Sequence, residues 1–281
     1  MHTLQAIITG SIQGLSEFLP ISSSAHIVFS NELYNLFTNS DISNINLEEE
    51  IFFSIIIHLA TLLAVVLYFF KDLKEIIFGF IKSLKTKTYS DNNFKLVIYI
   101  ALSTIITGII GLLIKNPAEK LVENPQIICF FLFFTGLILI FSEKFYNGNK
   151  ELSLKTVILI AIAQGLAVLP GFSRSGLTIA TALFLGMNRV KAARFSFLMS
   201  IPVIFLASLV YPIIELDISQ IANFNHKAIT LGFFASFIVG YLCIKYFMKL
   251  LGQLSLKMFG GYCLGASCLM YLLFQFFYHQ Q

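Results

Sequence analysis

Near the start of the chain, a carboxylate, three hydroxyls and an imidazole occur close together in an otherwise apolar stretch: Glu17, the serines Ser22, Ser23 and Ser24, and His26. On a helix, His26 lies within about one turn of Ser22 and Ser23, so either hydroxyl can face its ring. A hydroxyl beside a base is the usual activated nucleophile. We therefore expect a reaction site here, with Ser23 as the first candidate nucleophile and His26 as its base. His26 as the nucleophile, or direct attack by water, stays open.

The cation that this stretch lacks occurs in the second half of the chain. Arg174 lies in the segment Pro170-Gly171-Phe172-Ser173-Arg174-Ser175-Gly176-Leu177-Thr178 and is the only Lys or Arg that falls inside the apolar pattern. Its guanidinium offers a fork of donors that matches phosphate oxygens, and a helix N-terminus presents free N–H groups to an anion. Together these features predict a phosphate or pyrophosphate pocket. The hydroxyls expected to bind the phosphate are those of Ser22, Ser24, Ser173, Ser175 and Thr178. The structural alternative is a Glu17–Arg174 ion pair that closes the fold, which leaves the serines and His26 unexplained.

The composition places these residues in a membrane protein. Of the 281 residues, 57% are hydrophobic and only 12% are charged, whereas about a quarter are charged in an ordinary soluble domain. No basic block points to nucleic acid. The cysteines Cys129, Cys243, Cys263 and Cys268 lie in apolar runs without metal-binding or redox spacing, so we expect them to be packing residues. A lone membrane histidine, His58, is expected to be packed or hydrogen-bonded.

The apolar runs predict an all-α integral membrane protein with six full transmembrane helices and two re-entrant helix pairs. The full spans are expected at 51–70, 94–114, 127–141, 195–214, 228–248 and 258–278. Two other apolar stretches, 3–37 and 157–186, are broken by Pro20 and Pro170, and neither half of either stretch is a clean span. We expect each to enter and leave the membrane on one face. The basic segment 71–95 and the segment 115–125 are expected to be loops.

The two broken stretches also suggest an internal repeat. Gln13-Gly14-Leu15 precedes Pro20 and its serines, and Gln164-Gly165-Leu166 precedes Pro170 and its serines at nearly the same spacing. The repeat halves are about 1–146 and 151–281 of a single polytopic membrane domain, 1–281. Each half holds an odd number of full spans, so the second half inserts with inverted topology.

Positive charge predicts the orientation in the membrane. Most of the 19 Lys and Arg residues fall in 71–95, 143–155, 187–194 and 245–257, whereas Lys115, Lys120 and Lys227 lie on the other side. The positive-inside rule then places both termini outside. The first helix pair dips in from outside and the second from inside, so their tips should meet near the middle of the membrane.

At these residues the sequence resembles the undecaprenyl-pyrophosphate phosphatase family of the bacitracin-resistance type. Gln13-x-x-x-Glu17 resembles its glutamate motif, in which Glu is frequent at the first position. Pro20-Ile21-Ser22-Ser23-Ser24-Ala25-His26 resembles its Ser/His segment, in which Gly usually precedes the His. Pro170-Gly171-Phe172-Ser173-Arg174-Ser175-Gly176 resembles its arginine motif. The resemblance extends over the whole chain in length, motif spacing and repeat plan.

The resemblance implies hydrolysis of the C55 prenyl pyrophosphate to the monophosphate in the bacterial cell membrane, which recycles the lipid carrier for peptidoglycan and protects against bacitracin. It also implies a divalent cation, Mg²⁺ or Ca²⁺, for which Glu17 and Gln13 are the candidate ligands. A homodimer stays open. The rival hypothesis is a prenyl-phosphate transporter or flippase, because an inverted repeat with a mid-membrane site also suits alternating access.

Overall fold

Six long apolar helices form the frame of the molecule. The computed structural model describes residues 2–38, 47–122, 124–215 and 218–278, and the regular structure in them is helical apart from one isolated bridge between Lys150 and Met187. The six helices long and apolar enough to cross a membrane in this described part are α3 (Leu47–Tyr68), α5 (Asn92–Val122), α6 (Pro125–Ser142), α9 (Arg189–Glu215), α10 (His226–Leu250) and α11 (Leu256–Tyr278). Their number and order confirm the predicted spans, and by length and composition the chain is a multi-pass membrane protein.

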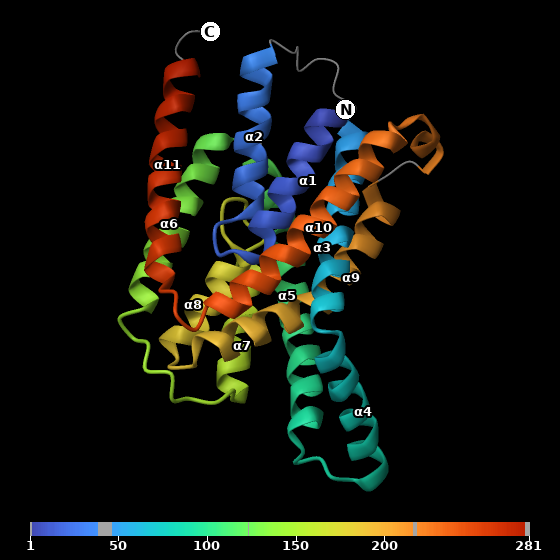
Figure 1. Ribbon diagram of the computed structural model, residues 1–281, viewed down its shortest axis with the longest axis vertical. Coiled ribbons are helices and arrows are strands. Elements are labelled where there is room, and N and C mark those ends of the chain that lie inside the picture. Colours follow the sequence, from blue (N-terminus) through green and yellow to red (C-terminus); the bar gives the residue numbers. More distant parts are fainter. Residues whose placement is uncertain (1, 39–46, 123, 216–217, 279–281) are drawn as a thin grey trace.

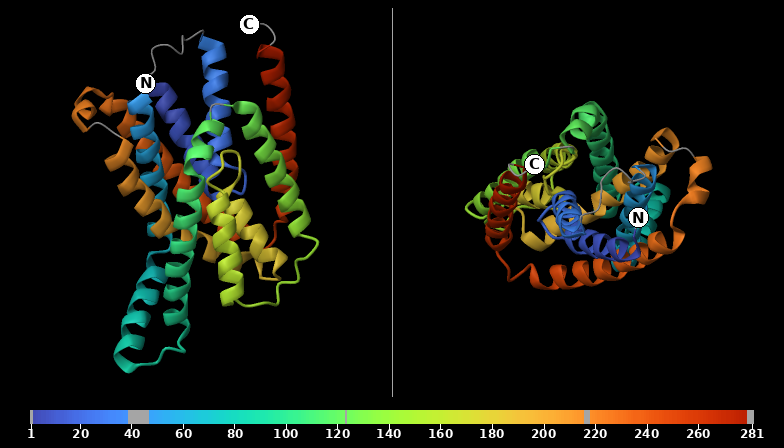
Figure 2. Two further views of the ribbon diagram at one scale, coloured as in Figure 1. Left: turned by 180° about the vertical axis from the view of Figure 1, so that it is seen from behind. Right: turned by 90° about the horizontal axis from the view of Figure 1, so that it is seen from above.

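Two pairs of shorter helices lie between these spans. They are α1 (Thr3–Phe18) with α2 (Ser23–Thr38), and α7 (Leu154–Leu166) with α8 (Arg174–Phe184). Each pair is interrupted at its predicted proline, Pro20 or Pro170, because proline lacks the N–H that a continuing helix needs. The two breaks lie in the interior of the molecule, where the tips of the pairs meet (Figure 2). That the pairs are re-entrant, and that the halves are inverted copies, stay predictions.

Two segments expected to be loops are helical. The first is α4 (Phe70–Thr86), which follows α3 after Phe69 and runs beside the start of α5 (Figure 1). Its lysines alternate with apolar residues such as Leu73, Ile76 and Phe80 at helical spacing, so the segment is an amphipathic helix and not an irregular basic loop. The helix ends at Lys87, which adopts a left-handed conformation with a φ of 55°.

The second segment is the end of α5, which continues through Lys115 to Val122 and contains Pro117. Lys115 and Glu119 are one helical turn apart, and their charged groups lie 3.6 Å from each other. Such an i,i+4 pair supports helix beyond the apolar run. The prediction from apolar length alone therefore ended this helix too early, at residue 114, whereas the helix ends at Val122.

The short helices are held by spans from the opposite half of the chain. Helix α1 packs along α10, and α7 packs along α5, while α6 pairs with α11 and α3 with α9. The remaining short element is the 3-10 helix η2 (Ile218–Asn223) before α10. Figure 1 shows that the start of α1, the end of α2 and the end of α11 lie toward the same end of the molecule.

The contact between α1 and α10 depends on two glycines four positions apart, Gly10 and Gly14. A Cβ atom added to Gly10 would lie 2.3 Å from the carbonyl oxygen of Gly232, and one added to Gly14 would lie 2.5 Å from that of Ser236. Both positions must therefore be glycine for the two backbones to approach this closely. Beyond Gly14, the buried ring of Phe18 meets that of Phe197 on α9 edge-on, with centroids 5.6 Å apart. These contacts fix the last turn of α1.

Candidate active site

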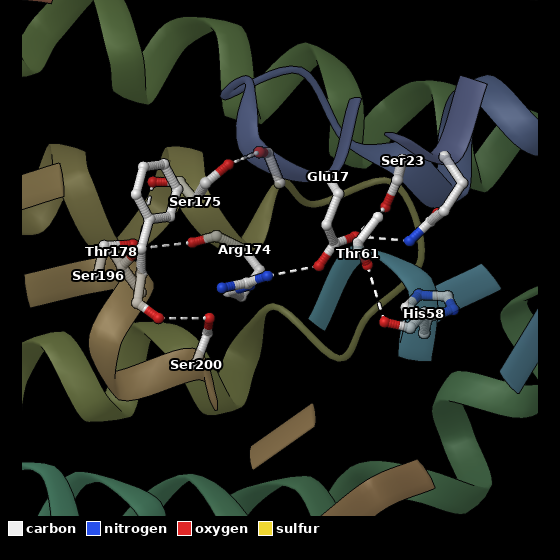
Figure 3. Close-up of polar contacts among 12 residues, drawn as sticks. Glu17, Ser23, His58, Thr61, Arg174, Ser175, Thr178, Ser196 and Ser200 are labelled. Atoms are coloured by element: carbon white, nitrogen blue, oxygen red, sulfur yellow. Dashed lines mark hydrogen bonds and ion pairs between the residues drawn. The ribbon is translucent and has the colours of Figure 1, made fainter. Parts of the chain in front are cut away.

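Glu17 is the centre of the site and accepts hydrogen bonds on both carboxylate oxygens. Arg174 Nη2 lies 2.5 Å from Oε1, and Oε2 accepts from Gln13 Nε2 at 2.9 Å and from Ser23 Oγ at 3.1 Å. Figure 3 shows Arg174 reaching Glu17 from one side, with Ser23 and His58 on the other. Glu17 and Gln13 are both buried. The predicted ion pair thus exists, and it also orients the hydroxyl of Ser23.

The turn after α1 presents the serines of α2. Pro20 ends the first helix, and Ser22 takes a left-handed conformation with a φ of 71° before α2 begins. The Ser22 hydroxyl accepts the backbone N–H of Ala25 at 3.3 Å and so caps the start of α2. Ser23, the next residue, is left to reach Glu17.

The start of α8 supplies the cation. Ser173 caps this helix by accepting the N–H of Gly176 at 3.0 Å, and Arg174 is its first residue. Gly171 precedes them with a φ of 98°, and a Cβ there would lie 2.3 Å from the carbonyl oxygen of Ile128. Glycine is therefore required for the loop to pass this close to α6. The loop directs Arg174 back toward the first helix pair.

The two tips are bonded directly to each other, as predicted. Ser24 Oγ accepts the N–H of Gly171 at 3.2 Å, and Ser175 Oγ donates to the carbonyl oxygen of Leu19 at 3.0 Å. Together with the Arg174–Glu17 pair, these bonds join residues about 150 positions apart in the chain. The site is therefore built at the junction of the two helix pairs.

A cavity of about 500 Å³ lies at this junction. One part of its wall carries polar groups and the other is apolar. The polar lining comprises Ser16, Glu17, Ser23, Ser24, Ser54, His58, Thr107, Gln164, Ser173, Arg174, Ser200 and Ser208; the apolar lining comprises Ile51, Ile55, Val122, Ala167, Val168, Pro170, Phe172, Val203, Ile204 and Ala207. A charged headgroup with an apolar tail would match both parts. The buried Nη1 of Arg174 has no hydrogen-bond partner among the described residues, so one arm of the guanidinium remains available.

Several predicted site residues make structural contacts and do not line the cavity. Ser22 caps α2, and Ser175 bonds the backbone of Leu19. Thr178 Oγ1 donates to the carbonyl oxygen of Arg174 at 2.8 Å and lies 2.6 Å from Ser196 Oγ on α9. Their hydroxyls are engaged with protein groups, and their binding of phosphate stays a prediction.

The expected pairing of His26 with a serine hydroxyl is wrong. His26 Nδ1 donates to the carbonyl oxygen of Ser22 at 2.8 Å, and Nε2 lies 2.7 Å from the hydroxyl of Tyr262 on α11. The two rings stack with centroids 5.5 Å apart. This ring therefore anchors α2 to α11 and is not among the groups that line the cavity.

The polar cavity residues that were not expected at the site include His58 on α3, Gln164 on α7 and Ser200 on α9. His58 is hydrogen-bonded as predicted, since Nδ1 lies 2.7 Å from the carbonyl oxygen of Ser54. A usable signal was the spacing of Ser54 and His58, four residues apart in an apolar run. For Gln164, the signal was its correspondence to Gln13 in the repeat.

The candidate metal pair does not fit a divalent cation. Gln13 turns its amide nitrogen toward Glu17, and its buried Oε1 has no partner within the described ranges. Both oxygens of Glu17 already accept hydrogen bonds, one of them from a cation. In the part of the chain that the structure describes, no group of three His, Cys, Asp or Glu residues could hold a metal ion. The described protein groups alone therefore form no preassembled metal site.

Fold and site together define a helical membrane protein with a cavity, lined by Glu17 and Arg174, between two broken helix pairs. Residues 6–269 match the model of the family described as Bacitracin resistance protein BacA. The chain belongs to this family.

Curated relatives agree with this assignment. An undecaprenyl-diphosphatase of Methanobrevibacter smithii is 39% identical, with 94% of each chain covered. One of Methanosphaera stadtmanae is 40% identical, covering 94% of this chain and 95% of the relative. Undecaprenyl-diphosphatase 2 of Halalkalibacterium halodurans is 37% identical, covering 99% of this chain and 96% of the relative.

Proposed function

We propose that this protein is a membrane phosphatase that hydrolyses undecaprenyl diphosphate to undecaprenyl phosphate and inorganic phosphate. Its physiological role is then to recycle the lipid carrier for peptidoglycan and other envelope polymers and to confer bacitracin resistance. The observation that carries the proposal is the guanidinium of Arg174, which lines the same cavity as Ser23. Its Nη2 is hydrogen-bonded to Glu17, and its Nη1 has no partner among the described residues. Family membership and the names of the relatives support the same reaction.

Arg174 binds the terminal phosphate in this proposal. Its Nη2 is held by Glu17, so the unpartnered Nη1 is the arm left to donate to a phosphate oxygen. The first two N–H groups of α8, those of Arg174 and Ser175, lie at the positive end of a helix dipole and add to the attraction. These groups stabilise the charge that spreads over the phosphoryl oxygens in the transition state.

Ser23 is the proposed nucleophile, because its hydroxyl already donates to Glu17 Oε2. The Ser23 oxygen bonds to the terminal phosphorus while its proton passes to that carboxylate. The bond from phosphorus to the bridging oxygen breaks, and undecaprenyl phosphate leaves with the electron pair and takes up the proton from Glu17. Water then hydrolyses the phosphoserine. Ser24 and Ser173, which also line the cavity, hydrogen-bond the phosphate.

The apolar wall of the cavity guides the prenyl chain into the lipid between α3, α5 and α9. Ile51 lies near the start of α3, Val122 ends α5, and Ala207 lies toward the end of α9. The cavity therefore extends toward the end of the molecule where α1 starts. With the termini outside, as the positive charges predict, the substrate enters from the outer face of the cell membrane.

The packing of the helices supports the inverted repeat with re-entrant pairs. Exchanging α1 for α7, α3 for α9, α5 for α10 and α6 for α11 turns the α1–α10 contact into α7–α5 and the α3–α10 contact into α9–α5, and leaves the α6–α11 and α3–α9 contacts unchanged. An internal two-fold relation has this property.

A divalent cation, Mg²⁺ or Ca²⁺, is proposed to arrive with the diphosphate and to be held through its oxygens. Mg²⁺ is commonly bound through substrate phosphates and water. Gln13 and Glu17 are not assigned as its ligands. No step of the proposed reaction depends on the ion.

Phosphate release from undecaprenyl diphosphate by purified protein in detergent tests the function. We expect Arg174→Ala and Glu17→Ala to lose turnover, and wild-type turnover by either variant would refute this site. The same assay separates hydrolysis from the rival flippase function, because vectorial transport is impossible without a sealed membrane. A wild-type protein that releases no phosphate would exclude the phosphatase.

A further inference from the structure

His58 is the one imidazole that reaches the cavity among the described residues. It lies on α3, on the same side of Glu17 as Ser23 in Figure 3. The described groups lining this cavity that can carry a charge are Glu17 on α1, His58 on α3 and Arg174 on α8. An imidazole in such a place can exchange protons with a reacting molecule.

The hydrogen bond to Ser54 fixes which ring nitrogen is basic. Nδ1 lies 2.7 Å from the carbonyl oxygen of Ser54, and a carbonyl oxygen can only accept. Nδ1 therefore carries the hydrogen, and in the neutral ring Nε2 has the free lone pair. Within the described ranges no side chain or backbone group hydrogen-bonds Nε2. His26 differs, since Tyr262 occupies its Nε2.

We propose that His58 is the base that activates the hydrolytic water. This rests on the proposed phosphatase reaction, in which Ser23 already has its own proton acceptor in Glu17. The group that still lacks an acceptor is water, and Nε2 of His58 is the free base in the same cavity. In the second step, the water oxygen bonds to the phosphorus of phosphoserine and a water proton passes to Nε2. The bond from phosphorus to Ser23 Oγ breaks, and the imidazolium returns the proton to Oγ, which regenerates serine and releases inorganic phosphate.

The variant His58→Gln tests this assignment. Glutamine keeps the size and a hydrogen-bond donor but cannot take up a proton, so the first step remains and the second slows. General base catalysis contributes about 10²–10⁴-fold. We expect steady-state phosphate release to fall by at least about a hundredfold. With substrate labelled on the terminal phosphate, we expect a burst of one undecaprenyl phosphate per protein and label accumulating on Ser23. The matched control is His226→Gln at the exposed start of α10, which should keep wild-type turnover.

A second measurement tests whether the loss of turnover comes only from a structural role of His58. His58→Ala leaves space beside the open cavity, and imidazole added to the detergent solution should restore part of its turnover and discharge the labelled protein. Wild-type turnover by His58→Gln would overturn the proposal, and so would slow turnover without a burst and without label. A wild-type protein without phosphate release would instead reject the phosphatase function itself, so the two failures are distinguishable.

Discussion

Arg174 Nη2 and Glu17 Oε1 lie 2.5 Å apart, although 157 positions separate the two residues in the chain. Each comes from the broken end of a different helix pair, and neither has another described partner of opposite charge inside the cavity. The pair closes the fold and at the same time orients the guanidinium for a ligand. In the proposed reaction, stability and substrate binding therefore depend on the same two side chains.

The variant Arg174→Lys separates these two roles. A lysine ammonium is a single point charge, so it can hold Glu17 or contact phosphate but cannot present two arms in a fixed plane. We expect kcat/KM for undecaprenyl diphosphate to fall by about a hundredfold, in the range for loss of a transition-state donor. The melting temperature should fall less than in Arg174→Ala, which leaves a buried carboxylate unpaired at a cost of about 3–5 kcal/mol. Equal activity of Arg174→Lys and wild type would show that one arm suffices.

Ser23 can be tested as the nucleophile by direct labelling. Acid quenching of wild-type protein during turnover of substrate labelled on the terminal phosphate should leave label on Ser23, and Ser23→Ala should abolish both label and turnover. Ser11→Ala is the control, because the Ser11 hydroxyl only donates to the carbonyl oxygen of Ile7 within α1. Active Ser23→Ala protein without label would mean that water attacks the diphosphate directly.

The close contact of α1 and α10 predicts a steric effect of Gly10→Ala. The new methyl group would meet the carbonyl oxygen of Gly232 at 2.3 Å, so the two backbones must separate. Overpacking of this kind costs about 1–3 kcal/mol, and thermal unfolding in detergent should show a lower melting temperature. Gly265→Ala on α11 is the control, since a Cβ there meets nothing within 4 Å. Equal melting of the two variants would contradict the observed helix contact.

Glu143 at the end of α6 predicts a pH dependence of stability. Its carboxylate accepts from Arg189 Nε at 3.0 Å and Nη2 at 2.5 Å, and from the N–H of Leu256 at 2.8 Å. Burial raises the pKa of Glu143, but these hydrogen bonds and the charge of Arg189 outweigh it and hold the pKa below its usual 4.5. The stabilisation is therefore present above the pKa of the unfolded chain and is lost as the pH falls through the lower folded value.

The variant Glu143→Gln should accordingly melt at a lower temperature than wild type at pH 7. The difference should shrink as the pH falls below about 4.5, because wild-type Glu143 then becomes protonated as well. Glu151→Gln, which removes a solvent-exposed partner of Lys191, should change melting little at either pH. A difference between Glu143→Gln and wild type that persists unchanged in acid would rule out the ionised carboxylate as its source.

Metal removal provides a further test. Since the carboxylate of Glu17 is satisfied by protein groups, EDTA in the absence of substrate should leave the melting temperature unchanged. A ligand that binds only the folded state would raise it. A clear rise on addition of Mg²⁺ or Ca²⁺ alone would reveal a preassembled site and would contradict the donor set described above.

The parts of the fold that follow local rules could be predicted from the sequence. Pro20 and Pro170 mark the breaks because proline removes a backbone donor, and the six spans follow from apolar length. The junction of the tips followed from the repeat and the charge distribution. Helix α4 was missed because its many lysines were interpreted as a sign of a loop, although the apolar residues between them recur at helical spacing.

The orientation of individual side chains could not be predicted in the same way. His26 turns to Tyr262, which lies 236 positions later in the chain, and sequence spacing from Ser22 and Ser23 says nothing about that partner. His58 reaches the cavity because of where α3 lies relative to the two tips. Such contacts depend on tertiary packing, whereas helix periodicity reports only neighbours on the same helix.

The exchange of helix partners between the two halves also constrains how the molecule is made. Helix α1 leaves the ribosome well before its packing partner α10, which is synthesised only from residue 226 onward. Until α10 is made, the face of α1 that carries Gly10 has no packing partner. Glu17 likewise lacks its ion-pair partner until Arg174 is made. The packing of α1 into its final position is thus a late step of synthesis. A chain truncated before α10 would retain every residue of the cavity but would lack the helix that holds α1 in place.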